Sequence, residues 1–405
     1  MVNSIFLLVG VAVACFVAYN IGGATTGPAF APAVGAGVLG KFAAAGLMAV
    51  FFFVGAWTIG RRVVDTLGQE LVRDPAIFTL SASIIVLFFI GGALFVGNLF
   101  GVPASTSMTA VGSIAGLGLA SGQLNWAVMG EIVSWWIVAP IIGFWVAGVV
   151  GRYFYVYLDN LIAIDQTEGS LVEIDRSGAI PQPVAGPNTT TRELVGSGIV
   201  ISIGCLMAFA SGTSNIANAI APLVGSGNLD MNVGIVVGSI AVAVGAFTIG
   251  RRTMETLGND ITELPLTAAI VVATISSALV VGLSAIGIPA SFVVIATMSI
   301  VGLGWGRATR TTTLSDSVRG EEAPRASVGG LKADKETATV GDPTVSDEAT
   351  PKPIGEESPE EVPSASELFN PSTTARVIVM QNVVPILATI GSYSTFFLLL
   401  RFGYL

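Results

Sequence analysis

Long apolar stretches alternate with short polar ones along most of this chain. Eight apolar runs approach or reach the length of about 20 residues that a helix needs to cross a bilayer. They lie at 1–20, 42–60, 78–100, 129–150, 195–212, 231–249, 265–285 and 376–400. Two shorter runs, rich in Gly and Ser, lie at 105–121 and 288–305. This pattern predicts an all-α polytopic membrane protein.

The second half of the chain repeats the first. GAWTIGRRVVDTLG at 55–68 matches GAFTIGRRTMETLG at 245–258, with an offset of 190 residues. With an offset of 186, GVPAS at 101–105 falls on GIPAS at 287–291. Internal repeats of hydrophobic segments are typical of transporters, where they are frequently inverted. We therefore expect two inverted repeats.

Gly, Pro and polar residues interrupt the apolar pattern at matching places in both repeats. One pair of interrupted segments is 22–37 and 212–227, and the other is 101–118 and 287–304. Non-helical backbone at membrane depth is tolerated only where protein or a water-filled cavity satisfies it. The four segments are therefore predicted to be broken or re-entrant helices that face the interior.

The order of these segments predicts five parts. They are a first transmembrane repeat (1–152), a hydrophilic linker (153–193), the first part of a second repeat (194–305), an acidic loop (306–370) and the final transmembrane helix (371–405). The acidic loop holds 13 of the 27 Asp and Glu residues and 7 of the 18 Lys and Arg residues. It is rich in Pro, Ser, Thr and Glu, so we expect a disordered hydrophilic insertion in the second repeat.

The amino-acid composition limits the kinds of chemistry that this chain can perform. Only 11% of residues are charged, against about 25% in a typical soluble domain. There is no His, which excludes a His-based proton relay or metal site within this chain. Cys15 and Cys205 both lie inside apolar runs, and they are interpreted as small buried residues. No cofactor and no covalent catalysis are expected, so the chain is not predicted to be an enzyme.

PASTS, from Pro103 to Ser107, places three hydroxyl side chains at the predicted start of a helix. Ser and Thr are favoured N-cap residues, and the free N–H groups and positive dipole end of a helix bind anions. Two interpretations stay open: an ordinary helix cap, or an anion site with neutral donors. The second repeat has only Ser291 at the matching place, so an anion site would have most of its hydroxyl groups in the first repeat.

SNIAN, from Ser214 to Asn218, places two amides three residues apart, on one face of a helix at membrane depth. Amide oxygens can bind a hard cation such as Na⁺, and amide N–H groups can donate to a phosphate oxygen. Hydrogen bonding between helices is the alternative. At the matching place in the first repeat only Thr25 offers a polar side chain.

These motifs, in this order and doubled, resemble the inorganic phosphate transporter family (the PiT or PHO4-type permeases). GTSNIANA at 212–219 is a close variant of that family's G-A-N-D-V-A-N-A motif, and GGATTGPA at 22–29 is a degenerate one. PASTSM at 103–108 is similar to its P-V-S-T-T-H segment, and VGAGVL at 34–39 to its Gly-rich run. The resemblance covers most of the chain outside 306–370.

The resemblance assigns expected binding residues by position. Phosphate would be bound by Ser105, Thr106, Ser107, Ser291 and Asn218, and the coupling cation by Thr25, Ser214, Asn215 and Asn218. No metal is expected beyond Na⁺. The expected partners are inorganic phosphate, a coupling cation (Na⁺ or H⁺) and membrane lipid, without nucleic acid, and a homo-oligomer stays open.

The chain departs from the family pattern at its carboxylates. The two motif aspartates fall on Asn215 and Thr25, and the His that often follows Ser-Thr-Thr falls on Met108.

The implied function is a cation-coupled phosphate permease of the cell membrane that works by alternating access. Two rivals stay open: a permease for sulfate or another oxyanion on the same scaffold, and a divergent paralogue that has lost coupling and acts as a channel-like or sensory protein.

Overall fold

The computed structural model describes most of the chain. The described residues are 2–35, 37–99, 105–162, 172–175, 182–185, 190–252, 254, 266–311 and 371–403. Most of the predicted acidic loop, from 312 to 370, lies outside this set.

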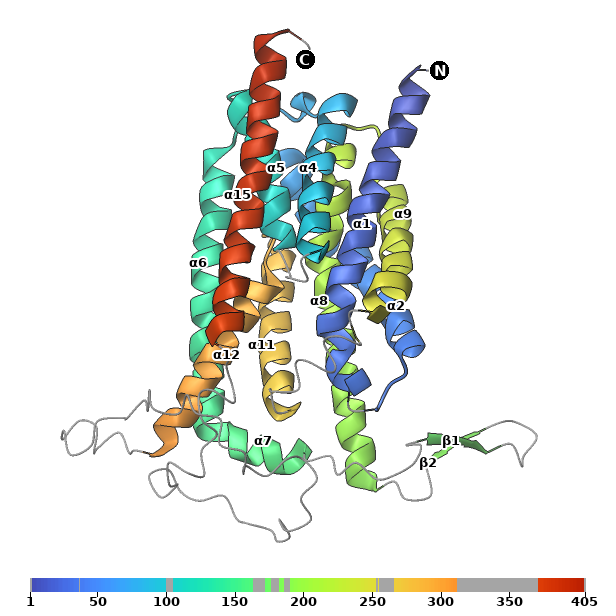
Figure 1. The fold of residues 1–405 in the computed structure, drawn as a ribbon, viewed down its shortest axis with the longest axis vertical. Helices are drawn as coiled ribbons and strands as arrows, with labels where there is room; N and C mark the ends of the chain where they lie inside the picture. The colour runs from blue at the N-terminus through green and yellow to red at the C-terminus, as the bar shows by residue number, and fades with distance from the viewer. Residues whose placement is uncertain are drawn as a thin grey trace, which may run out of the picture.

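The described residues form an elongated bundle of helices, with both termini at the same end (Figure 1). The α-helices are α1 (Val2–Gly35), α2 (Lys41–Thr58), α3 (Gly60–Asp65), α4 (Leu80–Leu99), α5 (Thr106–Ala120), α6 (Trp126–Val149), α7 (Tyr155–Ile162), α8 (Thr191–Gly225), α9 (Met231–Gly245), α11 (Leu266–Ala285), α12 (Phe292–Ala308) and α15 (Pro371–Arg401). Short π-helical segments are η1 (Thr66–Glu70), η3 (Val150–Phe154) and η4 (Ala246–Gly250), and 3-10 turns are η2 (Pro75–Ile77) and η5 (Thr309–Thr311).

One short antiparallel ribbon departs from the all-α prediction. It pairs β1 (Val172–Asp175) with β2 (Gln182–Ala185) inside the predicted linker. Both strands lie outside the helical bundle (Figure 1). The described membrane-spanning segments are all helical, as expected.

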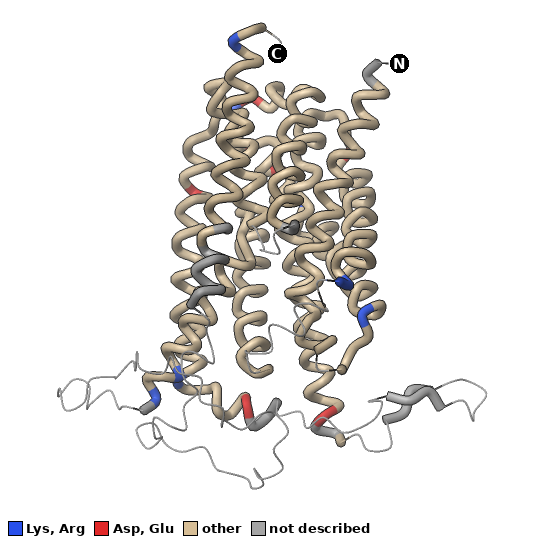
Figure 2. The backbone as a smooth tube through the Cα atoms, viewed as in Figure 1, with Lys and Arg blue, Asp and Glu red and all other residues tan. Residues whose placement is uncertain are grey.

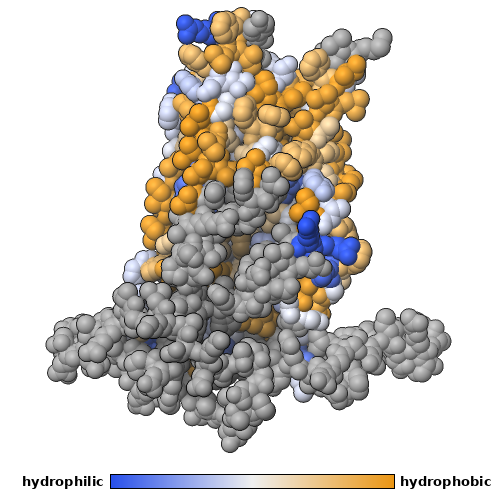
Figure 3. All heavy atoms as spheres, in the orientation of Figure 1, coloured by the Kyte–Doolittle hydropathy of each residue, from blue (hydrophilic) through white to orange (hydrophobic). Residues whose placement is uncertain are grey.

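The prediction of eight spans is confirmed. Eight helices, some with their flanking turns, are long and apolar enough to cross a membrane: Ser4–Gly35, Lys41–Thr58, Leu80–Gly97, Trp126–Asp159, Glu193–Gly225, Met231–Gly250, Leu266–Ala285 and Gln381–Arg401. Charged residues are sparse along the bundle and lie mainly toward its two ends (Figure 2). The visible face of the described helices is largely hydrophobic (Figure 3), as a lipid-facing surface requires.

The prediction of broken helices at 22–37 and 212–227 is wrong for most of both segments. α1 and α8 run unbroken through these segments to Gly35 and Gly225. In α1 the hydroxyl groups of Thr25 and Thr26 are satisfied within the helix: Thr26 Oγ1, for example, donates to the carbonyl oxygen of Gly22 at 2.6 Å. The glycines have another purpose, which is close packing between helices.

The second pair of interruptions is confirmed where it is described: an irregular segment at 286–291 separates α11 from α12, while residues 101–104 of the first interruption lie outside the described residues. α5 has 15 residues and α12 has 17, which gives about 22 and 25 Å of helix, less than the hydrocarbon core of about 30 Å. α4 and α5 lie in the upper half of the bundle, and α11 and α12 lie in its lower half (Figure 1). α11–α12 is a helical hairpin whose tip is an irregular segment inside the bundle.

Helices of one repeat pack on helices of the other. α1 lies against α9 and α2 lies against α8, while α5 packs on α15 and α12 packs on α6. A Cβ atom added to Gly22 would collide with the backbone carbonyl of Val242, and one added to Gly212 would collide with that of Phe52. Gly212 and Phe52 are the counterparts of Gly22 and Val242 when the two repeats are aligned with an offset of 190 residues. The two repeats therefore share this helix–helix contact as well as their sequence.

Candidate functional site

The first turn of α5 presents hydroxyl groups inside the bundle. Ser105 is the N-cap residue, with extended backbone, and its Oγ accepts from the Met108 N–H at 3.3 Å. Thr106 and Ser107 follow in the first turn, and the Ser107 side chain is fully buried. The first N–H groups of a helix have no partner within it and carry the positive end of its dipole. This turn can therefore receive negative charge without a cationic side chain.

We call the packed pair α4–α5 the first hairpin and α11–α12 the second hairpin. The second hairpin brings its own helix start to the same place. Ser291 caps α12, with its Oγ 3.5 Å from the Val294 nitrogen. The carbonyl oxygen of the preceding Ala290 lies 3.0 Å from the Ser107 hydroxyl of the first hairpin. The starts of α5 and α12 thus meet within the bundle.

The middle of α8 crosses this meeting point. Ser214 Oγ lies 3.2 Å from Ser107 Oγ and 3.0 Å from the Ala290 carbonyl oxygen. Thr106 Oγ1 donates to Asn215 Oδ1 at 2.6 Å, and Asn218 Nδ2 donates to the same oxygen at 3.1 Å. We call Thr106, Ser107, Ser214, Asn215 and Asn218 the polar cluster.

One oxygen of the polar cluster lacks a donor. Asn218 is fully buried, and its Oδ1 has no hydrogen-bond partner in the part of the chain that the structure describes. A buried unpaired acceptor costs about 1–3 kcal/mol. An amide oxygen in this position has the chemistry of a ligand for a hard cation.

Thr25 is not connected to the polar cluster by any hydrogen bond among the described residues. Its hydroxyl donates to the carbonyl oxygen of Ile21, one turn earlier in α1, at 2.7 Å. This bond satisfies the half-buried hydroxyl locally. The structure therefore unites the α5 and α8 candidates, with Ser291 beside them, and leaves Thr25 apart.

Two residues at the site were not among the sequence candidates. Ser211 Oγ accepts from Asn215 Nδ2 at 3.0 Å and so fixes that amide. Its position four residues before Asn215 could have revealed it, because i and i+4 share a helix face. Trp136 Nε1 donates to the carbonyl oxygen of Pro289, at 2.8 Å, next to the tip of the second hairpin. Nothing in the spacing of the sequence marks that contact.

The polar cluster has no side chain that titrates near neutral pH. Across the described residues, no group of three or more His, Cys, Asp or Glu side chains is placed to hold a metal ion. Glu131, the main carboxylate within the predicted spans, is exposed on α6. The electrostatics of the site therefore come from helix ends, hydroxyl groups and amides.

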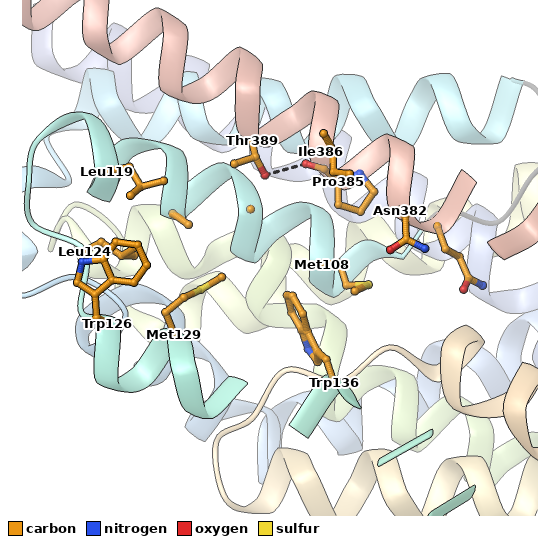
Figure 4. A pocket seen from close by; sticks show the side chains of 13 residues that line it. Met108, Leu119, Leu124, Trp126, Met129, Trp136, Asn382, Pro385, Ile386 and Thr389 are labelled. Atoms are coloured by element: carbon orange, nitrogen blue, oxygen red, sulfur yellow. Dashed lines mark hydrogen bonds between the residues drawn. The ribbon is translucent and has the colours of Figure 1, made fainter. Parts of the chain in front are cut away.

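A cavity of about 260 Å³ lies between α5, α6 and α15 (Figure 4). Its walls are Met108, Gly112, Ala115, Leu119, Leu124, Trp126, Met129, Trp136, Gln381, Asn382, Pro385, Ile386 and Thr389. Met108 follows Ser107 directly in the first turn of α5. One wall residue of the cavity is therefore a sequence neighbour of the polar cluster.

The chain is similar in sequence to known transport proteins. The model of a family described as the phosphate transporter family matches residues 21–323. The sulfate permease CysP of Bacillus subtilis (strain 168) is 29% identical over 293 residues, which cover 72% of this chain and 75% of that protein. A Chlamydia muridarum (strain MoPn / Nigg) protein, named provisionally as a phosphate permease, is 27% identical, covering 76% of this chain and 92% of its own.

A solved structure has the same fold. It is titled as the sodium-dependent phosphate transporter, and it superposes with a TM-score of 0.65 at 16% identity. The match covers 98% of this chain and 99% of the other.

Proposed function

Because this chain belongs to the phosphate transporter family, we propose that it moves inorganic phosphate across the cell membrane, driven by a coupling cation and by alternating access. Its eight candidate spans make it a multi-pass membrane protein. The family and the solved neighbour are transporters rather than enzymes.

One observation carries the proposal. The hydroxyl-bearing first turn of α5 and the start of α12 meet inside the bundle, opposite buried amides in the middle of α8. Thr106, Ser107 and Ser291 then offer hydroxyl groups to the anion, together with free N–H groups of α5. Ser105 shapes this turn as its cap, and Asn218 contributes an amide from the facing helix.

The cation is assigned to the α8 side of the polar cluster. Asn215 Oδ1, Asn218 Oδ1 and Ser214 Oγ are neutral oxygens, and the Asn218 oxygen has no donor. Hard cations bind such oxygens. Coupling to H⁺ requires a group that titrates, and the polar cluster has none among its side chains. Na⁺ is therefore the coupling ion we propose, and Thr25 joins its site only if α1 moves.

The energetics of uptake require more than one cation. Moving a divalent anion inward against about 100 mV costs about 4.6 kcal/mol, and a hundredfold accumulation costs about 2.8 kcal/mol more. One Na⁺ that enters down the same potential and a tenfold gradient returns about 3.7 kcal/mol. At least two Na⁺ per divalent phosphate follow from these figures.

The hairpins supply a mechanism for alternating access. We infer that the repeats are inverted, since α4–α5 and α11–α12 occupy opposite halves of the bundle (Figure 1). Each hairpin packs on the final helix of the other repeat, α5 on α15 and α12 on α6. Movement of one hairpin with its partner helix would expose the polar cluster to one side of the membrane while the other pair keeps it closed.

Uptake into proteoliposomes tests the function. We expect labelled phosphate to accumulate under an inward Na⁺ gradient with the interior negative, and not under a proton gradient of equal size. Vesicles without the protein are the control. Equal phosphate levels inside and outside, whatever gradient is imposed, would favour an uncoupled paralogue.

Sulfate is the second candidate substrate, and one observation favours it. The polar cluster contains no carboxylate to accept the proton of a monohydrogen phosphate, and sulfate has no such proton at neutral pH. The B. subtilis relative named above is a sulfate permease. If excess unlabelled sulfate abolishes phosphate uptake, and labelled sulfate accumulates faster, sulfate replaces phosphate as the proposed substrate.

Asn215→Asp tests the cation assignment. A carboxylate at this position adds a full negative charge to the oxygen that now accepts from Thr106, so the Na⁺ concentration for half-maximal uptake should fall about tenfold, equivalent to about 1.4 kcal/mol. The matched control is Asn228→Asp, because Asn228 is exposed beyond the end of α8. An unchanged Na⁺ dependence in Asn215→Asp would remove this residue from the coupling site.

A further inference from the structure

Gln381 of α15 carries a buried hydrogen-bond donor without an acceptor. The side chain is 2% exposed, and its Nε2 has no hydrogen-bond partner among the described residues. Burying an amide in this way costs about 1–3 kcal/mol unless something accepts its hydrogen bonds. The residue lines the cavity between α5, α6 and α15.

The backbone carbonyl oxygen of Gln381 also lacks its usual hydrogen bond within the helix. Pro385 lies inside α15, four residues later, and proline has no N–H to donate to the carbonyl oxygen of residue i−4. Pro385 lines the same cavity, as Figure 4 shows. The side-chain N–H of Gln381 therefore needs an acceptor, and its carbonyl oxygen needs a donor such as a water molecule.

The cavity has room for such an occupant, and one of its lining residues is next to the proposed anion site along α5. Its volume of about 260 Å³ far exceeds the roughly 10–15 Å³ that one water molecule needs on this measure. Met108 forms part of its wall and lies one residue after Ser107. Figure 4 shows Met108 and Trp136 close together at the cavity wall.

The counterpart of Gln381 in the first repeat shows how such a donor is satisfied inside the protein. Aligning Pro140 with Pro385 places Trp136 on Gln381, with an offset of 245. Trp136 Nε1 donates to the carbonyl oxygen of Pro289 at 2.8 Å. The donor of Gln381 has no such acceptor, although both residues line the same cavity.

We propose that the Gln381 amide N–H binds the transported tetrahedral oxyanion in this cavity, at an access site next to the first turn of α5. The unpaired side-chain group is a donor, and none of the described residues that line the cavity is acidic, so its ligand is an acceptor rather than a cation. This inference rests on the proposed transport function and adds a second binding position to it.

Kinetics of the Gln381→Leu variant test the proposal. The loss of a hydrogen bond to a charged ligand should raise KM for the anion about tenfold, with the maximal rate within about twofold of the wild type. Gln381→Glu differs by one atom and retains the shape of the side chain. Its KM should rise further at neutral pH and fall again toward pH 5, as the carboxyl becomes protonated.

A buried polar residue elsewhere on α15 provides the matched control. Ser392 donates to the carbonyl oxygen of Ser113 and does not line the cavity, so Ser392→Ala should leave KM unchanged. Each protein is assayed with labelled phosphate and with labelled sulfate, at equal amounts of monodisperse protein. The substrate of the wild type then decides which oxyanion occupies the site.

Three outcomes would overturn the inference or its premise. A KM for Gln381→Leu within twofold of the wild type overturns the access site and leaves the proposed function intact. A pH-independent KM in Gln381→Glu shows a structural residue, with the same consequence. A wild-type protein that takes up neither anion, and whose melting temperature neither anion raises, overturns the proposed function and the access site together.

Discussion

Phosphate uptake by the double variant Thr106→Val, Ser107→Ala should fall at least 100-fold below that of the wild type. The change removes two hydroxyl donors from the first turn of α5 and leaves the Ser105 cap in place. Hydrogen bonds to charged groups are worth about 1.5–3 kcal/mol each, so losing two corresponds to a factor of 100 or more in binding. Initial uptake rates into proteoliposomes, below saturation, measure this effect.

The structure offers a control in the same helix. Thr109 is fully buried, and its Oγ1 donates to the carbonyl oxygen of Ser105 at 2.8 Å. Thr109→Val therefore removes a buried hydroxyl from α5 without removing a donor from the polar cluster. The assignment of the anion site to this turn would be wrong if the double variant transported phosphate as well as Thr109→Val does.

Gly212→Ala should strongly destabilise the folded protein, by about 3 kcal/mol or more. The added Cβ atom would collide with the backbone carbonyl of Phe52, where α8 crosses α2. A backbone carbonyl cannot rotate away as a side chain can, so the two helices must separate. Thermal unfolding of the purified protein, followed by the fraction that stays monodisperse, measures the loss.

A second glycine separates this collision from the general effect of adding a methyl group. A Cβ atom on Gly282, within α11, would meet nothing within 4 Å. Gly282→Ala should be neutral or slightly stabilising, because Ala has the higher helix propensity. A melting temperature for Gly212→Ala equal to that of Gly282→Ala would show that the close approach of α8 and α2 is dispensable.

The sequence could predict the spans and the second pair of interruptions for clear physical reasons. A membrane helix is recorded in local composition, since about 20 successive apolar residues are needed. GVPAS and GIPAS were also local signals, and α5 and α12 begin where they end. The polar residues of SNIAN were recognisable because they lie in an apolar context.

The wrong prediction of broken helices at 22–37 and 212–227 arose because glycine has two structural roles. Gly22 and Gly212 suggested interruptions, yet they lie in continuous helices and permit close contact with Val242 and Phe52. A glycine that bends a chain and a glycine that admits a neighbour look the same in sequence. The donor of Gln381 was invisible for a similar reason, because its lack of an acceptor depends on the shape of a cavity.

Because helices of one repeat pack on helices of the other, the bundle cannot be completed until late in synthesis. α1 and α2 emerge first, but the helices against which they pack, α9 and α8, are made only after residue 190. At about 5–20 residues per second, this delay lasts from several seconds to more than half a minute. The faces of α1 and α2 that later contact α9 and α8 must meanwhile face lipid or the insertion machinery. A chain whose synthesis stops halfway would therefore contain only an unpaired half of the bundle.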